Sequence, residues 1–142
     1  MRRVIFDTGI YVAYLRRGDL ARAVETTTRL GIVHLSVVVA EELLVGAPDR
    51  QSLIFLERLI ERFDAVNRLA VPTRLDWLRA GQAIREIGRR DGYELVGRAR
   101  LTNDALITAT ALSLGAAIVT RNVDDFARLQ EQMAVAVVYP PS

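Results

Sequence analysis

Short apolar runs divide the chain at regular intervals and predict the strands of a sheet. They are rich in β-branched residues and continuous rather than alternating, as is typical of strands buried on both faces. The runs cover residues 4–6, 32–35, 69–71, 117–119 and 135–138. Both faces of a parallel sheet are covered by helices, so the pattern favours parallel pairing.

Longer segments between these runs carry apolar residues at helical spacing. They predict helices over residues 9–17, 20–30, 36–46, 52–63, 73–90, 103–115 and 123–132. Thr73 and Asp76 have the N-cap and N3 spacing of a capping box, and Gly115 follows its helix as a C′ residue. Alternation of strands and helices predicts an α/β three-layer sandwich, with a central, mostly parallel five-stranded sheet flanked by helices. We expect residues 1–142 to form one domain.

Composition narrows the chemistry. The 142 residues are 51% hydrophobic and include no cysteine, which excludes a disulfide framework, a thiolate metal site and a cysteine nucleophile. Every basic residue except His34 is arginine, and the net charge is +2. Arginine pairs well with phosphate, so the charge permits a nucleic-acid partner without requiring one.

The distribution of apolar residues also predicts the compartment. Asp7 interrupts the first apolar run, which is therefore too short for the core of a signal peptide. We find no stretch that approaches the roughly 18–20 apolar residues of a membrane helix. These features predict a soluble, cytoplasmic protein without a membrane partner.

Acidic residues occur where the predicted fold would bring them together. Asp7 ends the first strand, and functional groups in α/β sheets gather beyond the carboxyl ends of the strands. The other candidates lie in or beside predicted helices: Glu41, Glu42, Asp104, Asp124 and Asp125. Several converging carboxylates repel one another unless a cation compensates them. An all-oxygen cluster suits Mg²⁺ or Mn²⁺, which would polarise a phosphodiester and activate an attacking water.

Each acid alone also has a structural explanation. Asp104 could complement the dipole at the start of its helix, and Asp125 could be the N3 partner of Asn122. Glu41 and Glu42 could both be exposed. Gly46 lies one turn beyond Glu42 and would leave room on that face, which favours Glu42 over Glu41.

Other catalytic schemes fit less well. His34 is the single histidine and lies in an apolar run, which indicates a structural role and argues against a Ser-His-Asp triad. We find neither a Walker-type phosphate loop nor a Rossmann glycine pattern. Tyr11, Tyr14 and Trp77 lie at helical spacing and are expected in the core.

Three blocks of sequence resemble a known family. The segments "VIFDTGIYVAYL", "LSVVVAEELLVGA" and "LTNDALITATALSLGAAIVTRNVDDF" are similar, in that order, to the signature blocks of the PIN domain. The closest group is the VapC-type toxins of bacterial and archaeal toxin–antitoxin pairs. The blocks span nearly the whole chain, and the length is that of a stand-alone member.

The resemblance implies a metal-dependent ribonuclease with a central parallel sheet. In the family, acids that match Asp7, Glu42 and Asp104 hold Mg²⁺ or Mn²⁺, so the alignment of blocks selects Glu42. A metal-bound water would attack the phosphorus of RNA in line. Members commonly form homodimers and are silenced by a cognate antitoxin, for which helix residues Tyr11, Tyr14 and Leu15 are a candidate groove.

One position departs from the family pattern. Many relatives carry a fourth acid directly after the "TR" pair, where this chain has Asn122. Asp125 matches an acid that other members carry three residues later, and we place it with the catalytic residues. Asn122, Asp124 and Asp125 all remain candidates for the fourth position, and the number of metals stays open.

Three alternative functions are consistent with parts of the sequence. The domain could act only as a binding module, or as a housekeeping RNA-processing nuclease that shares the same site. A third possibility is a phosphatase with Asp7 as nucleophile. Such enzymes usually carry a second aspartate two residues later, where this chain has Gly9, and the chain has no lysine to neutralise the phosphate.

Overall fold

Strands and helices alternate through the computed structural model, which describes residues 2–92, 94 and 99–141. The strands are β1 (Arg3–Phe6), β2 (Ile32–Ser36), β3 (Leu69–Ala70), β4 (Ala116–Val119) and β5 (Val137–Val138). The helices are α1 (Thr8–Arg17), α2 (Ala21–Leu30), α3 (Val37–Val45), α4 (Arg50–Ala65), α5 (Arg74–Asp91), α6 (Ala99–Leu114) and α7 (Val123–Gln132).

The strands form one five-stranded sheet in the order β3-β2-β1-β4-β5. Every neighbouring pair is parallel, with Ile5 of β1 opposite His34 of β2 on one side and Ile118 of β4 on the other. The predicted α/β sandwich is confirmed, and its sheet is parallel throughout.

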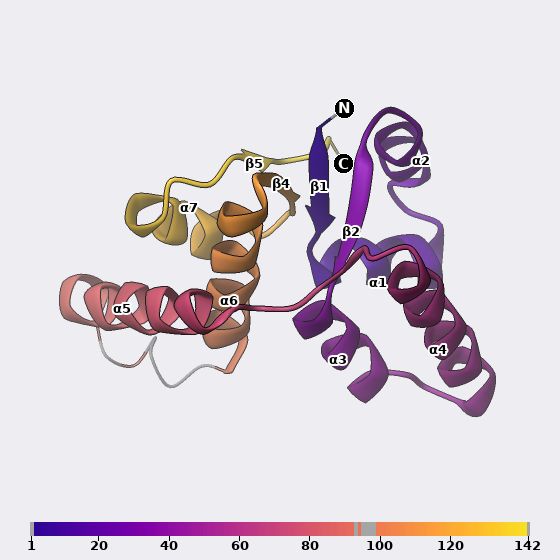
Figure 1. Ribbon diagram of the computed structural model, residues 1–142, viewed down its shortest axis with the longest axis horizontal. Coiled ribbons are helices and arrows are strands. Elements are labelled where there is room, and N and C mark those ends of the chain that lie inside the picture. Colours follow the sequence, from indigo (N-terminus) through magenta and orange to yellow (C-terminus); the bar gives the residue numbers. More distant parts are fainter. Residues whose placement is uncertain (1, 93, 95–98, 142) are drawn as a thin grey trace.

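The strand order places helices on both faces of the sheet. Parallel crossovers are right-handed, and the direction of travel reverses between β3 and β4, so α1–α4 cover one face and α5–α7 the other. Figure 1 shows the two groups to the right and to the left of the strands. The reversal makes the carboxyl ends of β1 and β4 a topological switch point, where open α/β sheets bind their ligands.

The core lies between the sheet and these helices. Ile5 and Ile118 of the central strands have no exposed surface, and neither have Phe126 and Leu129 of α7. Complete burial of one such side chain stabilises the fold by about 1.5–3 kcal/mol. Together they fix α7 against the sheet and so determine where the loop before it lies.

Local signals mark several element boundaries as predicted. Thr73 and Asp76 form the capping box of α5, with reciprocal side-chain to backbone hydrogen bonds. Gly115 ends α6 with a φ of 70°, a left-handed conformation that favours glycine. α6 begins at Ala99 rather than at residue 103, so Asp104 lies inside the helix and not in its first turn. The proposed dipole role of Asp104 is therefore wrong.

The aromatic residues divide between core and surface. Tyr11 is buried and packs edge-on against Phe6, with ring centroids 5.7 Å apart, and Tyr14 is half-buried. Trp77 is 57% exposed, so the prediction that it belongs to the core is wrong. It lies on α5 beside the buried Asp76, and its spacing alone could not tell which face of α5 meets α6.

His34 occupies the middle of β2 and is buried, as its apolar run predicted. Its Nε2 has no hydrogen-bond partner among the described residues, and burial together with the charges of Arg3 and Arg68 lowers its pKa. A neutral imidazole inside the sheet is consistent with a structural role. Within the described part of the chain, no helix is both long and apolar enough to cross a membrane.

Candidate active site

Asp7 lies directly beyond β1 at the switch point. Its backbone N–H still donates to the carbonyl of Val119 in β4, at 2.9 Å, and its side chain caps α1 by accepting from Thr8 N at 2.8 Å. The second carboxylate oxygen accepts from Thr120 Oγ1 at 2.8 Å. Asp7 is only 5% exposed, so strand, helix and Thr120 together hold a carboxylate in a nearly buried position.

Glu42 reaches the same region from α3. Its Oε1 accepts a hydrogen bond from Thr8 Oγ1 at 2.6 Å, which links α3 to the start of α1. Glu41, the neighbouring candidate, is exposed. The room expected beside Gly46 is taken by Arg16, which donates to the Gly46 carbonyl. The Thr8 contact therefore supports Glu42, whereas the argument from space near Gly46 is wrong.

Asp104 lies in the second turn of α6 and is only 2% exposed. Its Oδ2 accepts from the side-chain amide of Asn122 at 3.3 Å. Buried carboxylates are normally paired or fully hydrogen-bonded, because burial of a charge is costly. Among the described residues, Asp104 accepts a single long side-chain hydrogen bond, from a neutral amide, so its charge is poorly compensated there.

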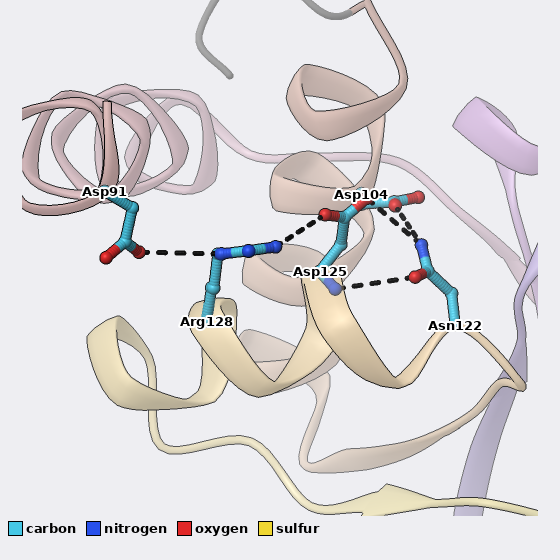
Figure 2. Close-up of polar contacts among 5 residues, drawn as sticks. All are labelled: Asp91, Asp104, Asn122, Asp125 and Arg128. Atoms are coloured by element: carbon cyan, nitrogen blue, oxygen red, sulfur yellow. Dashed lines mark hydrogen bonds and ion pairs between the residues drawn. The ribbon is translucent and has the colours of Figure 1, made fainter. Parts of the chain in front are cut away.

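Asn122 and Asp125 complete this edge of the site. Asn122 caps α7 by accepting from the Asp125 N–H at 3.4 Å, and its amide nitrogen lies 3.2 Å from Asp125 Oδ2. The suggested N-cap and N3 pairing is therefore present, in addition to the contact with Asp104 that Figure 2 shows. Asp125 is half-buried, whereas Asp124 is exposed.

The electrostatics indicate that the carboxylates crowd one another. Burial is the largest cause that raises the pKa of Asp104, and the negative charges of Asp7, Glu42 and Asp125 add to it against a lowering by Arg100, so that the pKa reaches about 8. Burial also raises the pKa of Asp7, although the hydrogen bonds from Thr120 and Thr8 oppose that shift. The four predicted acids therefore lie close enough to affect one another's charge, and among the described residues Arg100 opposes their effect on Asp104.

The donors suit a hard divalent cation. All are oxygens, which Mg²⁺ and Mn²⁺ prefer, and a bound cation would supply the charge that Asp104 lacks. Among the described residues, no group of three or more His, Cys, Asp and Glu side chains has the geometry of a preformed metal cage. The chemistry of the donors therefore fits a divalent cation, and the carboxylates would have to draw together around it.

Sequence reasoning does not single out three residues that shape the site. Thr8 and Thr120 hold Asp7 and Glu42, and Arg128 pairs with Asp125 at 3.3 Å. The arginine has a local signal, because it follows Asp125 by three residues on one helix. The contact of Thr120 with Asp7 joins residues 113 positions apart, for which the sequence carries no local signal.

The fold and the site together place this chain in a broad class: parallel α/β domains with buried carboxylates at the switch point of the sheet. The sequence profile of the PIN domain matches residues 4–132, which is most of the chain. The chain therefore belongs to the PIN-domain family. A VapC ribonuclease of Mycobacterium bovis and ribonuclease VapC11 of Mycobacterium tuberculosis are each 33% identical over 125 residues, covering 85% of this chain and 87% of theirs.

Solved structures share the fold at lower identity. VapBC-1 of nontypeable Haemophilus influenzae superposes with a TM-score of 0.69 at 24% identity, covering 96% of this chain and 97% of that one. VapBC2 of Rickettsia felis, bound to a DNA fragment from its promoter, gives a TM-score of 0.68 at 17% identity over 98% and 99% of the two chains. At these identities the likeness supports the fold alone.

Proposed function

We propose that this protein is a metal-dependent ribonuclease and the toxin of a toxin–antitoxin pair. The single observation that carries the proposal is the poorly compensated carboxylate of Asp104 beside Asp7, buried at the switch point of the sheet. The relatives named VapC ribonuclease support RNA as the substrate. The high proportion of arginine is consistent with a polyanionic substrate.

Asp7, Glu42 and Asp104 are the residues proposed to hold Mg²⁺ or Mn²⁺. When bound, such a cation supplies Lewis-acid polarisation of the phosphodiester and lowers the pKa of the attacking water. Thr120 and the start of α1 fix Asp7, and Thr8 fixes Glu42, so two of the three carboxylates are oriented before a cation arrives. Asp125 is assigned to the site through its contact with Asn122.

The partners follow from the same family membership. We assign an antitoxin as partner because the structural neighbours are VapBC complexes. The homodimer is proposed from the resemblance to the family alone. A cavity of about 520 Å³ between α1, α2 and α4 supports an antitoxin groove, since its lining includes the predicted Tyr11, Tyr14 and Leu15. Phe55 and Phe63 add apolar surface from α4.

A cleavage assay tests the proposed activity. Purified protein is incubated with a panel of labelled structured RNAs in Mg²⁺, Mn²⁺ or EDTA, beside Asp7→Asn and Asp124→Asn variants. Asp124→Asn is a matched control, because it removes the same charge from an exposed position next to Asp125. We expect metal-dependent cleavage by the wild type and the control, and none by Asp7→Asn.

The pattern across variants decides the outcome. Equal cutting by wild type and Asp7→Asn, or cutting that persists in EDTA, would mean that no cleavage depends on the acidic site and would contradict the proposal. Metal binding without cleavage would instead favour a binding module. Cleavage of a host precursor RNA with no growth arrest on expression would favour the housekeeping nuclease over the toxin.

A further inference from the structure

A continuous row of polar contacts leads from the end of α5 to the buried carboxylate of Asp104. It joins three helices, and Figure 2 shows its members side by side: Asp91, Arg128, Asp125, Asn122 and Asp104. The outer end of the row is at the surface and the inner end is buried. The row therefore connects a surface ion pair with the buried carboxylate of Asp104.

Arg128 joins the outer and the inner part of this row. Its Nε lies 3.5 Å from Asp91 Oδ2, and its Nη1 lies 3.3 Å from Asp125 Oδ1. The guanidinium thus uses separate nitrogens for carboxylates on two helices, which its rigid planar fork permits. The side chain of Asp125 is 15% exposed and that of Arg128 is 34% exposed, so the inner contact is better shielded from water than the outer one.

Asp125 has both carboxylate oxygens engaged. Oδ1 faces Arg128, and Oδ2 lies 3.2 Å from the amide nitrogen of Asn122. The Asn122 oxygen is meanwhile occupied by the Asp125 N–H, which fixes the orientation of the amide group. Its nitrogen is then aimed at Asp104, 3.3 Å away.

We propose that Arg128 is a positioning residue that holds Asp125, and through it the Asn122 amide, so that Asp104 is oriented for a divalent cation. The inference rests on the proposed function, since it assigns Arg128 a role in the same metal site. Partners that orient a metal-binding carboxylate typically change metal affinity by about 10- to 100-fold when they are removed.

A positioning role and a simple charge effect predict opposite results. An arginine near an acidic site repels an incoming cation, so removing only its charge should strengthen metal binding. Removing an orienting contact should weaken metal binding, because the Asn122 amide and Asp104 lose their fixed geometry. The sign of the change therefore separates the two roles.

The fold offers a matched control for the loss of an ion pair. Arg90 of α5 pairs with Glu131 of α7 at 3.0 Å, so it bridges the same two helices as Arg128. Its contact is with Glu131 and not with Asp125. Arg90→Gln thus removes one charge and one bridge between α5 and α7, while among the described residues the ion pairs of the row that leads to Asp104 stay intact.

The experiment compares wild type with Arg128→Gln, Arg128→Lys and Arg90→Gln. Calorimetry measures Mn²⁺ affinity, and NMR follows the side-chain amide signals of Asn122 without metal, assigned from an Asn122→Asp variant. We expect Arg128→Gln to weaken Mn²⁺ binding about 10- to 100-fold and to shift the Asn122 signals. Arg128→Lys keeps the charge on a single nitrogen and should fall between Arg128→Gln and wild type. Arg90→Gln should change neither quantity.

Cleavage is measured on the same samples. At limiting Mn²⁺ we expect Arg128→Gln to lower kcat with KM for RNA unchanged, and excess Mn²⁺ to restore kcat. Three results would each overturn the inference. They are wild-type Mn²⁺ affinity in Arg128→Lys, tighter Mn²⁺ binding by Arg128→Gln, and Asn122 signals that do not shift in Arg128→Gln. If Arg128→Gln fails to fold, Asp91→Asn is used instead, because it removes the charge that Arg128 contacts on α5. We then expect changes in Mn²⁺ affinity and in the Asn122 signals in the same direction, but smaller.

The wild-type measurements separate this inference from the proposed function. If the wild type binds Mn²⁺ but cuts no RNA, only the proposed ribonuclease function is overturned. Mn²⁺ affinity and the Asn122 signals then still decide the role of Arg128. A wild type that binds no Mn²⁺ overturns both proposals.

Discussion

Two regions of this molecule bury an aspartate almost completely, yet they treat the carboxylate differently. At the start of α5, Asp76 is 1% exposed, and both of its oxygens accept hydrogen bonds, one from Thr73 N at 2.8 Å and one from Ser113 Oγ. At the switch point, Asp104 is 2% exposed and accepts one side-chain hydrogen bond within the described part of the chain, from Asn122.

The difference shows that burial alone does not mark a functional carboxylate. Asp76 belongs to a capping box, where the backbone N–H at the end of a loop and a serine from α6 satisfy it. Asp104 lies near Asp7, Glu42 and Asp125, whose charges raise its pKa beyond the effect of burial. A buried acid with few donors and several acidic neighbours is the stronger sign of a cation site.

Cleavage activity should separate the two aspartates most strongly. Asp104→Asn is expected to lower RNA cleavage at least about 100-fold, because it removes a proposed ligand of a cation that would supply several kcal/mol of charge stabilisation. Asp76→Asn should leave cleavage unchanged. Ser113, its partner, lies nine residues beyond Asp104 on α6, which is about 13.5 Å along the helix axis.

Rates are measured at saturating Mg²⁺ on folded protein, with circular dichroism as the control for folding. Equal loss of activity in both variants would show that the assay reports fold integrity rather than the acidic site.

The pH dependence of stability should show the next largest effect. Because the folded pKa of Asp104 is about 8, against 3.8 as the ordinary value, the folded state holds an extra proton between these pH values. In EDTA the free energy of unfolding should therefore fall as pH rises from about 4 to about 8, by an amount on the order of a few kcal/mol, and then level off. Urea unfolding across this range measures the slope.

Asp104→Asn provides the control for that slope. The variant lacks the titrating group, so its stability should fall less steeply, with the remaining slope due partly to Asp7, whose pKa is also raised. Added Mn²⁺ should stabilise the wild type most at high pH, because metal binding needs deprotonated carboxylates. A wild-type stability that rises with pH in EDTA would contradict the assignment.

Replacement of Asp76 or Asp104 by alanine should produce the smallest difference between the two regions, measured as the stability of the fold. Asp76→Ala leaves the Thr73 N–H and the Ser113 hydroxyl without their acceptor, which should destabilise the protein by about 1–3 kcal/mol. Asp104→Ala also removes a poorly compensated carboxyl, so in EDTA at pH 8 it should destabilise the protein less, or stabilise it. Urea midpoints of the two variants test this, and an equal loss in both would remove the distinction between the two regions.

The sequence by itself determined the elements and the features that depend on near neighbours. Runs of β-branched residues predicted all the observed strands to within a few residues, because a strand buried on both faces must be apolar throughout. The capping box of Thr73 and Asp76, and the pairing of Asn122 with Asp125, also have local signals, since both join positions three residues apart.

Only the tertiary structure decided how the acids are held. The bond from Thr120 to Asp7 and the bond from Thr8 to Glu42 join segments brought together by crossovers between parallel strands. The burial of Asp104 and the exposure of Trp77 depend likewise on which helix face meets a neighbour. The spacing of apolar residues indicates that a helix has an apolar face. The desolvation of one carboxylate and the charges around it depend instead on atoms from segments far away in the sequence.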